Sequence, residues 1–130
     1  MAGLPGARWL ASSIMEMHID SSSFGNIKIN GRGYSSDVII YPDRVDGSWW
    51  RKEGHKLQQE DILEILRAAP QILIVGTGQD GRMKIDLQLK TLLEQKGIKL
   101  FAAITPEACK RHNDLIRGNK TVVTALHLTC

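Results

Sequence analysis

The stretch Gln71-Ile-Leu-Ile-Val-Gly-Thr-Gly-Gln-Asp-Gly81 decides the fold of this chain. Its first part, Ile72–Val75, is an almost continuous apolar run, which is typical of a strand covered on both faces of a sheet. Glycines then follow at 76, 78 and 81, with the spacing G-x-G-x-x-G. Glycine allows a sharp bend and a close approach of a ligand to the main chain. The stretch therefore predicts a buried strand that ends where a small anionic ligand could bind.

The sequence after this loop alternates between helical and strand patterns. Apolar residues at 85, 89, 92 and 93 predict a helix that ends at Gly97, and residues 98–104 predict the next strand. Thr105-Pro106-Glu107 has the composition of a helix start, with Thr as the cap, and residues 121–126 predict a last strand. Alternation of this kind implies parallel neighbours joined by right-handed crossovers.

Ligands in such sheets bind outside the carboxyl ends of the strands. We expect this edge to carry Gly76–Arg82 and Thr105. If the last strand is also parallel, His127 and Cys130 lie there as well; an antiparallel last strand would move them to the opposite edge.

The first half of the chain has the pattern of short antiparallel strands. They are expected at 27–29, closed by Asn30-Gly31, at 37–41, and at 48–51. Apolar residues at 62, 65, 66 and 69 then predict a helix that Pro70 stops. The fold class is therefore α/β, with an antiparallel β portion first and a βαβαβ portion after it.

Length and composition indicate one ordinary globular domain. The chain has 130 residues, 42% hydrophobic and 24% charged, with a net charge of +3. We expect residues 1–20 to be a disordered extension and residues 21–130 to form a single α/β domain. No apolar run approaches the roughly 20 residues that span a bilayer, and no basic block indicates nucleic-acid binding. We therefore expect neither a membrane nor a nucleic acid as a partner.

The two cysteines, Cys109 and Cys130, form no disulfide framework or zinc motif. We expect both to be reduced, in a cytoplasmic protein. Cys109 fits the core face of its helix. Cys130 could pair with His127 as thiol and imidazole, although an exposed terminal thiol without a role is favoured.

The glycine loop is the first candidate site. Main-chain N–H groups at a helix start could bind a phosphate or carboxylate, with Arg82 or Lys84 adding charge. A tight turn that needs glycine and binds nothing is about equally compatible with the pattern. The residues predicted to bind the ligand are Gly76, Thr77, Gly78, Gln79, Arg82 and Thr105.

The remaining candidates concern metals, catalysis and partners. The four histidines form no paired motif, so no metal site and no cofactor are expected. No convergent catalytic set can be assigned. Trp49 and Trp50 would face opposite sides of a strand, with one in the core. The other is either an exposed anchor for a protein partner or packed under the loop before Leu57.

Several segments together resemble the domain-of-unknown-function family of the adipogenesis-associated Mth-type domain proteins, which is related to a mitochondrial complex I assembly factor. The resemblance covers about residues 24–130. It rests on Trp50-Arg51 with Gly54-His55, the loop Ile74–Gly78, Lys96-Gly97-Ile98, Thr105–Asn113, and the ending His127–Cys130. It includes the first two glycines of the loop but not Gly81. It implies a compact three-layer α/β domain with a mixed central sheet and no established catalysis.

The leading hypothesis is a non-catalytic binding or assembly-factor-like protein, with Trp50, Arg51 and His55 as partner-binding residues. The alternative is an enzyme or sensor that binds a small anionic or nucleotide-like ligand at the glycine-rich loop. The partner is then a protein or a small anion, and a homodimer stays open.

Overall fold

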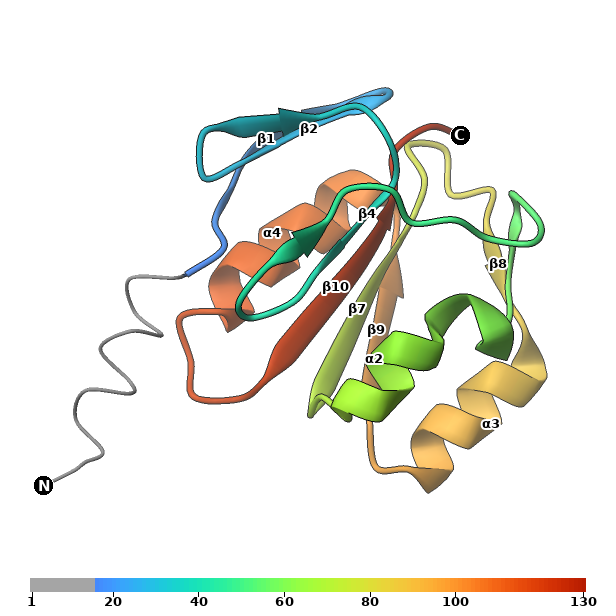
Figure 1. Ribbon diagram of the computed structural model, residues 1–130. Helices are drawn as coiled ribbons and strands as arrows, with labels where there is room; N and C mark the ends of the chain where they lie inside the picture. The colour runs from blue at the N-terminus through green and yellow to red at the C-terminus, as the bar shows by residue number, and fades with distance from the viewer. Residues whose placement is uncertain (1–15) are drawn as a thin grey trace, which may run out of the picture.

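A five-stranded sheet of mixed strand direction forms the centre of the computed structural model, which describes residues 16–130 (Figure 1). Its strands lie in the order β5-β4-β10-β7-β9. They are β4 (Val38–Ile40), β5 (Val45–Asp46), β7 (Ile72–Thr77), β9 (Lys99–Ala103) and β10 (Val122–His127). β7 pairs in parallel with both β9 and β10, whereas β4 is antiparallel to β10 and β5 is antiparallel to β4. The mixed α/β fold with a mixed central sheet is therefore confirmed.

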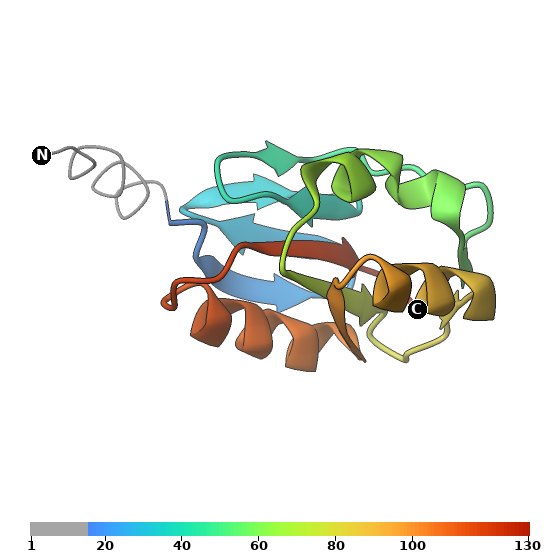
Figure 2. The same ribbon diagram turned by 90° about the horizontal axis from the view of Figure 1, so that it is seen from below.

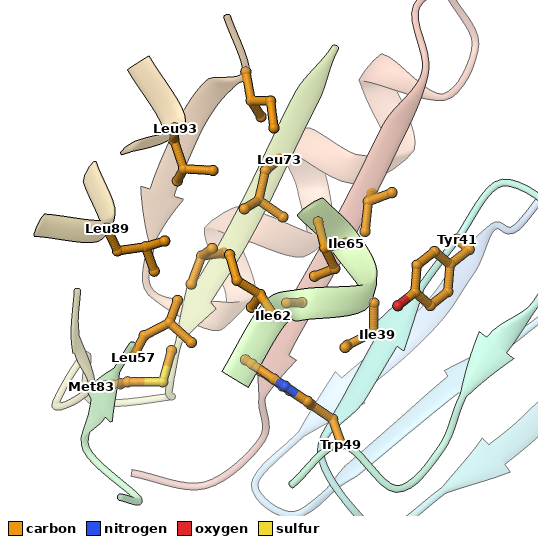
Figure 3. Close-up of a cluster of buried hydrophobic side chains, with 14 residues drawn as sticks. Ile39, Tyr41, Trp49, Leu57, Ile62, Ile65, Leu73, Met83, Leu89 and Leu93 are labelled. Carbon is orange, nitrogen blue, oxygen red and sulfur yellow. The ribbon is translucent and has the colours of Figure 1, made fainter. Parts of the chain in front are cut away.

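Successive residues of β7 supply two separate cores, as the alternation of side chains along a strand requires. Leu73 and Val75 belong to a cluster that includes residues of α2 (Leu63–Ala68) and α3 (Leu87–Gln95). Figure 3 shows part of this cluster, with Leu89 and Leu93 facing Leu73 across the space between α3 and the sheet. Ile72 and Ile74 belong to a second cluster, which includes residues of α4 (Thr105–Leu115). Figure 2 shows β10 between α2 and α4, so helices cover both faces of the sheet.

Smaller elements complete the fold. A second sheet, β1 (Ile19–Ser23), β2 (Asn26–Ile29) and β3 (Arg32–Tyr34), packs its apolar residues into the cluster that contains α4. Asn30 and Gly31, with φ of 48° and 81°, form the turn between β2 and β3, because a two-residue hairpin of this type needs positive φ at both positions. The 3-10 helix η1 (Gln59–Ile62) leads into α2, and β6 (Lys56–Leu57) pairs in parallel with β8 (Lys84–Ile85).

Three local predictions are wrong. Residues 48–51 are not a strand, although their burial alternates: Trp49 is 7% exposed and Trp50 is 76% exposed. Ile85 belongs to β8 rather than to the following helix, which begins only at Leu87. Thr105 does not cap α4, because its hydroxyl donates instead to the main-chain oxygen of His127 at 2.6 Å.

The structure describes only the last residues of the expected N-terminal extension over residues 1–20. Residues 1–15 lie outside the described residues, while Ile19 and Asp20 are already part of β1. Among residues 16–130, no helix combines the length and the apolar character needed to cross a bilayer.

Candidate functional site

The glycine loop after β7 lies directly against the segment that follows β10. Because β10 is parallel to β7, both strands end at the same edge of the sheet. Figure 1 shows the C-terminus beside this loop. Main-chain N–H groups of the loop donate to neighbouring parts of the chain: Gly78 to Thr105 Oγ1 at 3.0 Å, Gln79 to the oxygen of Thr129 at 2.6 Å, and Arg82 to the oxygen of Cys130 at 3.0 Å. The loop thus holds the chain's own final residues.

The first two glycines are required by this close packing. A Cβ on Gly76 would lie 2.7 Å from Leu126 Cδ2 and 2.9 Å from Thr105 Oγ1. A Cβ on Gly78 would lie 2.4 Å from the main-chain carbon of Cys130. Real Cβ atoms do not approach other atoms this closely, so a side chain at Gly78 would displace the final segment, and one at Gly76 would displace Leu126 and Thr105. The glycine spacing is therefore explained by contact between two parts of one chain.

The structure brings the predicted ligand residues together but leaves few of their polar groups free. Thr105 is fully buried, and Thr77 Oγ1 donates to the oxygen of Ala103 at 3.1 Å. Arg82 is exposed. α3 begins six positions after Gly81, so the helix that follows the loop in sequence does not start at it. The start of α4 does lie against the loop, but the N–H of Thr105, its first residue, already donates to the oxygen of Gly78 at 3.0 Å. The side-chain nitrogen of Gln79 is buried without a hydrogen-bond partner. Anion binding at the loop stays a prediction.

A buried polar cluster lies at the same edge of the sheet. His127 Nδ1 lies 2.8 Å from Asp37 Oδ2 and 3.0 Å from Arg51 Nη2. Arg51 Nη1 is also 2.8 Å from Asp37 Oδ2, and the Arg51 side chain is only 5% exposed. Burial alone would raise the pKa of the Asp37 carboxyl, but hydrogen bonds from His127, from the N–H of Leu128 and from Arg51 outweigh it and lower that pKa. Asp37 is therefore a carboxylate that fixes the imidazole of His127.

His55 and Cys130 complete the cluster on its outer side. His55 is exposed and Cys130 is half-buried, with 3.4 Å between His55 Nε2 and Cys130 Sγ. The rings of His55 and His127 meet edge to face, with centroids 5.9 Å apart. The thiol thus pairs with His55 rather than with His127. Cys109, by contrast, is a free buried cysteine, and burial raises the pKa of its thiol.

Trp50 lies between two residues whose side chains are fixed in the interior. Trp49 is buried, and its Nε1 donates to the main-chain oxygen of Asp61 at 2.9 Å (Figure 3). The guanidinium of Arg51 stacks on the Trp49 ring at 4.6 Å. The expected division into one core tryptophan and one exposed tryptophan is confirmed, but Arg51 points inward. Of the three predicted partner-binding residues, only Trp50 and His55 are exposed.

A cavity of about 460 Å³ lies at the opposite edge of the sheet, where its lining includes Tyr41, His112 and Lys120. Burial lowers the pKa of His112 and raises that of Tyr41 to about 12. Both ring nitrogens of His112 are occupied, one 2.7 Å from Thr124 Oγ1 and the other 2.6 Å from the main-chain oxygen of Met17. Its imidazole therefore has a structural role, with no free nitrogen for acid–base chemistry.

Sequence reasoning missed Asp37 as a member of the site. It is 90 residues from His127, and an acid before a short strand carries no signal of its own. His55 was found only as a partner-binding candidate, and its proximity to Cys130 depends on a tertiary contact.

Comparisons with known proteins agree with the fold. A family model described as a protein of unknown function (DUF498/DUF598) matches residues 19–127. The human NADH dehydrogenase [ubiquinone] 1 alpha subcomplex assembly factor 3 is 28% identical over 113 residues, which are 85% of this chain and 60% of that protein. The chain thus spans less than two thirds of that relative.

Two solved structures show the same fold. A conserved hypothetical protein from Pyrococcus horikoshii OT3 is 30% identical, with a TM-score of 0.75 over 88% of this chain and 100% of that one. A Mth938-like domain from Bordetella pertussis is 20% identical, with a TM-score of 0.58 over 86% of this chain and 85% of that one. The resemblance inferred from the sequence is confirmed.

Proposed function

This chain belongs to the DUF498/DUF598 family of proteins of unknown function, and we propose that it is a non-catalytic protein-binding module that acts as an assembly factor. Its similarity to a human protein named as an assembly factor of NADH dehydrogenase supports a role in holding other proteins during assembly. A cytoplasmic location and a homodimer stay predictions.

The proposal rests on the exposure of Trp50 beside a tryptophan that is fixed in the core. Its side chain is 76% exposed, whereas its neighbour Trp49 is anchored in the core. A large aromatic side chain on a rigid stretch of main chain offers apolar area to a partner at a small cost in conformational entropy. Tryptophan is also enriched among the residues that dominate binding energy. His55 is also exposed and is the second predicted partner-binding residue with a side chain open to solvent.

The state of the polar groups supports a binding role over catalysis. Thr105 and His112 use their polar atoms in hydrogen bonds within the chain, and Asp37 is engaged by Arg51 and His127. A catalytic acid or base needs an atom within hydrogen-bond reach of a substrate. These three residues therefore use their polar atoms within the fold and not toward a substrate.

Substitution of the exposed tryptophan tests the proposal. We expect Trp50→Ala to weaken binding of a co-purifying protein partner by about 2 kcal/mol or more, roughly thirtyfold in affinity. Phe24→Ala is the matched control, because Phe24 is also a large exposed aromatic residue, 61% exposed in the turn between β1 and β2. The measurement is quantitative co-purification from the source cells, followed by a binding titration with the partner identified.

Equal retention of that partner by Trp50→Ala and the unsubstituted chain would contradict the proposal. So would a large rise in melting temperature with one member of a panel of nucleotides and phosphorylated metabolites. A ligand at 100 times its Kd adds about 2.7 kcal/mol of stability, which such a screen detects.

A further inference from the structure

We propose that His55, His127 and Cys130 form a binding site for a divalent transition-metal ion of the Zn²⁺ class. One potential ligand atom from each of the three residues lies within 4.8 Å of the others. Two imidazoles and a thiolate are a ligand set that Zn²⁺ binds well, and three protein ligands leave one of four tetrahedral positions open. The site departs from the sequence-based expectation of no metal, which considered only local spacing.

The distances are close to those that a shared metal ion requires. With Zn–N of about 2.05 Å and Zn–S of about 2.3 Å, tetrahedral geometry separates a nitrogen and a sulfur ligand by about 3.6 Å. His55 Nε2 and Cys130 Sγ are already 3.4 Å apart. The remaining separations need to shorten by on the order of 1 Å to reach the values that tetrahedral geometry gives. Rotation of the exposed His55 side chain can shorten its separation from His127, and rotation of the half-buried Cys130 side chain can bring its Sγ toward His127.

His127 is oriented as a metal ligand by residues behind it. Asp37 Oδ2 lies 2.8 Å from its Nδ1, so that nitrogen carries the proton and donates to the carboxylate. Arg51 Nη2, at 3.0 Å from the same nitrogen, has the main-chain oxygen of Gly54 as its acceptor at 3.1 Å. This tautomer, assigned from the hydrogen-bond network, puts the lone pair on Nε2. The hydroxyl of Thr129 lies 3.4 Å from that nitrogen and has to turn away for a metal ion to bind. A carboxylate on the far nitrogen of a ligating histidine is the usual arrangement around zinc.

The main chain holds the other two ligands in place while their side chains stay accessible. The N–H of Arg82 donates to the oxygen of Cys130 at 3.0 Å, and the N–H of Lys84 donates to the oxygen of His55 at 2.8 Å. Arg82 lies in the loop before β8, and Lys84 is the first residue of β8. The glycine loop and β8 thus bring a residue from the middle of the chain next to one from its end.

Binding has a defined proton balance. The Cys130 thiol loses its proton to solvent and the thiolate sulfur forms a bond to the metal ion, while both imidazoles bind as neutral ligands. The fourth position is then open to water or to a donor atom of a protein partner. The metal site does not depend on the proposed partner, because metal binding is measured on the isolated chain.

Co²⁺ titration of the metal-stripped 130-residue chain, in a reductant without thiols, tests the site. Co²⁺ occupies zinc sites and gives a thiolate-to-metal charge-transfer band together with intense visible bands when four-coordinate. We expect one equivalent to bind with both signatures, and Zn²⁺ to displace it, because tetrahedral sites of thiolate and imidazole ligands favour Zn²⁺. Cys130→Ser should abolish the charge-transfer band, and His55→Ala should weaken binding by tenfold or more.

Two matched controls separate this site from other residues of the same kind. Cys109→Ala and His18→Ala remove the other described cysteine and an exposed histidine, and both should keep the band. Asp37→Asn tests the positioning role: it should weaken Co²⁺ affinity by about 10- to 100-fold while the charge-transfer band remains. A wild-type chain without the band, or His55→Ala with unchanged affinity, would overturn the proposal.

Discussion

Gly78 has a φ of +107° and lies against the final residues of the chain. Two separate effects therefore exclude other residue types at this position. Positive φ strains any residue with a Cβ, and here the Cβ would also overlap the main chain of Cys130. The conformation of the glycine loop and the position of the cluster around His127 thus depend on the same residue.

Comparison with a second glycine separates the two effects. Gly97 has a φ of +73°, but a Cβ there would meet nothing within 4 Å. We expect Gly97→Ala to lower the free energy of unfolding by about 1 kcal/mol, from backbone strain alone. Gly78→Ala should cost at least about 2 kcal/mol, because overpacking adds to the strain. Equal losses in chemical denaturation of the two variants would show that the contact with Cys130 does not exist in solution.

At the scale of elements, α2 ends in an unusual way. Its C-terminal cap, Ala69, has a left-handed conformation with φ of 49°, and its N–H donates to the oxygens of Ile65 and Leu66. Glycine is common at such a cap because it has no Cβ to strain. Pro70 follows directly and prevents the helix from continuing. The left-handed conformation of Ala69 is therefore strained, and it lies where the helix has to end.

This strain predicts a stabilising substitution. Left-handed conformation costs a residue with a Cβ roughly 1–2 kcal/mol, while glycine costs about 0.5–1 kcal/mol in chain entropy. We expect Ala69→Gly to raise the free energy of unfolding by about 0.5 kcal/mol. Ala68→Gly, one residue earlier and inside α2, should lower it by a similar amount. A destabilised Ala69→Gly variant in urea denaturation would refute the assigned cap.

For the whole molecule, the fold was largely predictable and the site was not. Apolar patterns are local signals, and they correctly predicted β7, α3, β9 and β10, while Pro106 and Glu107 indicated the start of α4. The two-residue strands β6 and β8 have no periodicity to detect. Burial alternates at Trp49 and Trp50 as in a strand, although no strand is formed, because side-chain pattern does not report main-chain pairing.

The glycine spacing predicted a close approach to the main chain but not what approaches it. A ligand and a distant segment of the same chain require the same absence of a Cβ. The parallel direction of β10, which the sequence left open, decides that the final residues occupy this place. The same topology brings together His55, His127 and Cys130, which no local spacing connects.

The central claim is that the glycine loop binds the chain's own final segment, and amide hydrogen exchange followed by NMR tests it most directly. In phosphate-free buffer without ligand, we expect the amides of Gly78, Gln79 and Arg82 to exchange on the order of a hundredfold more slowly than that of exposed Asp80, since their hydrogen bonds must open first. Exchange as fast as that of Asp80, with protection only after inorganic phosphate is added, would contradict the claim and identify the loop as an anion site.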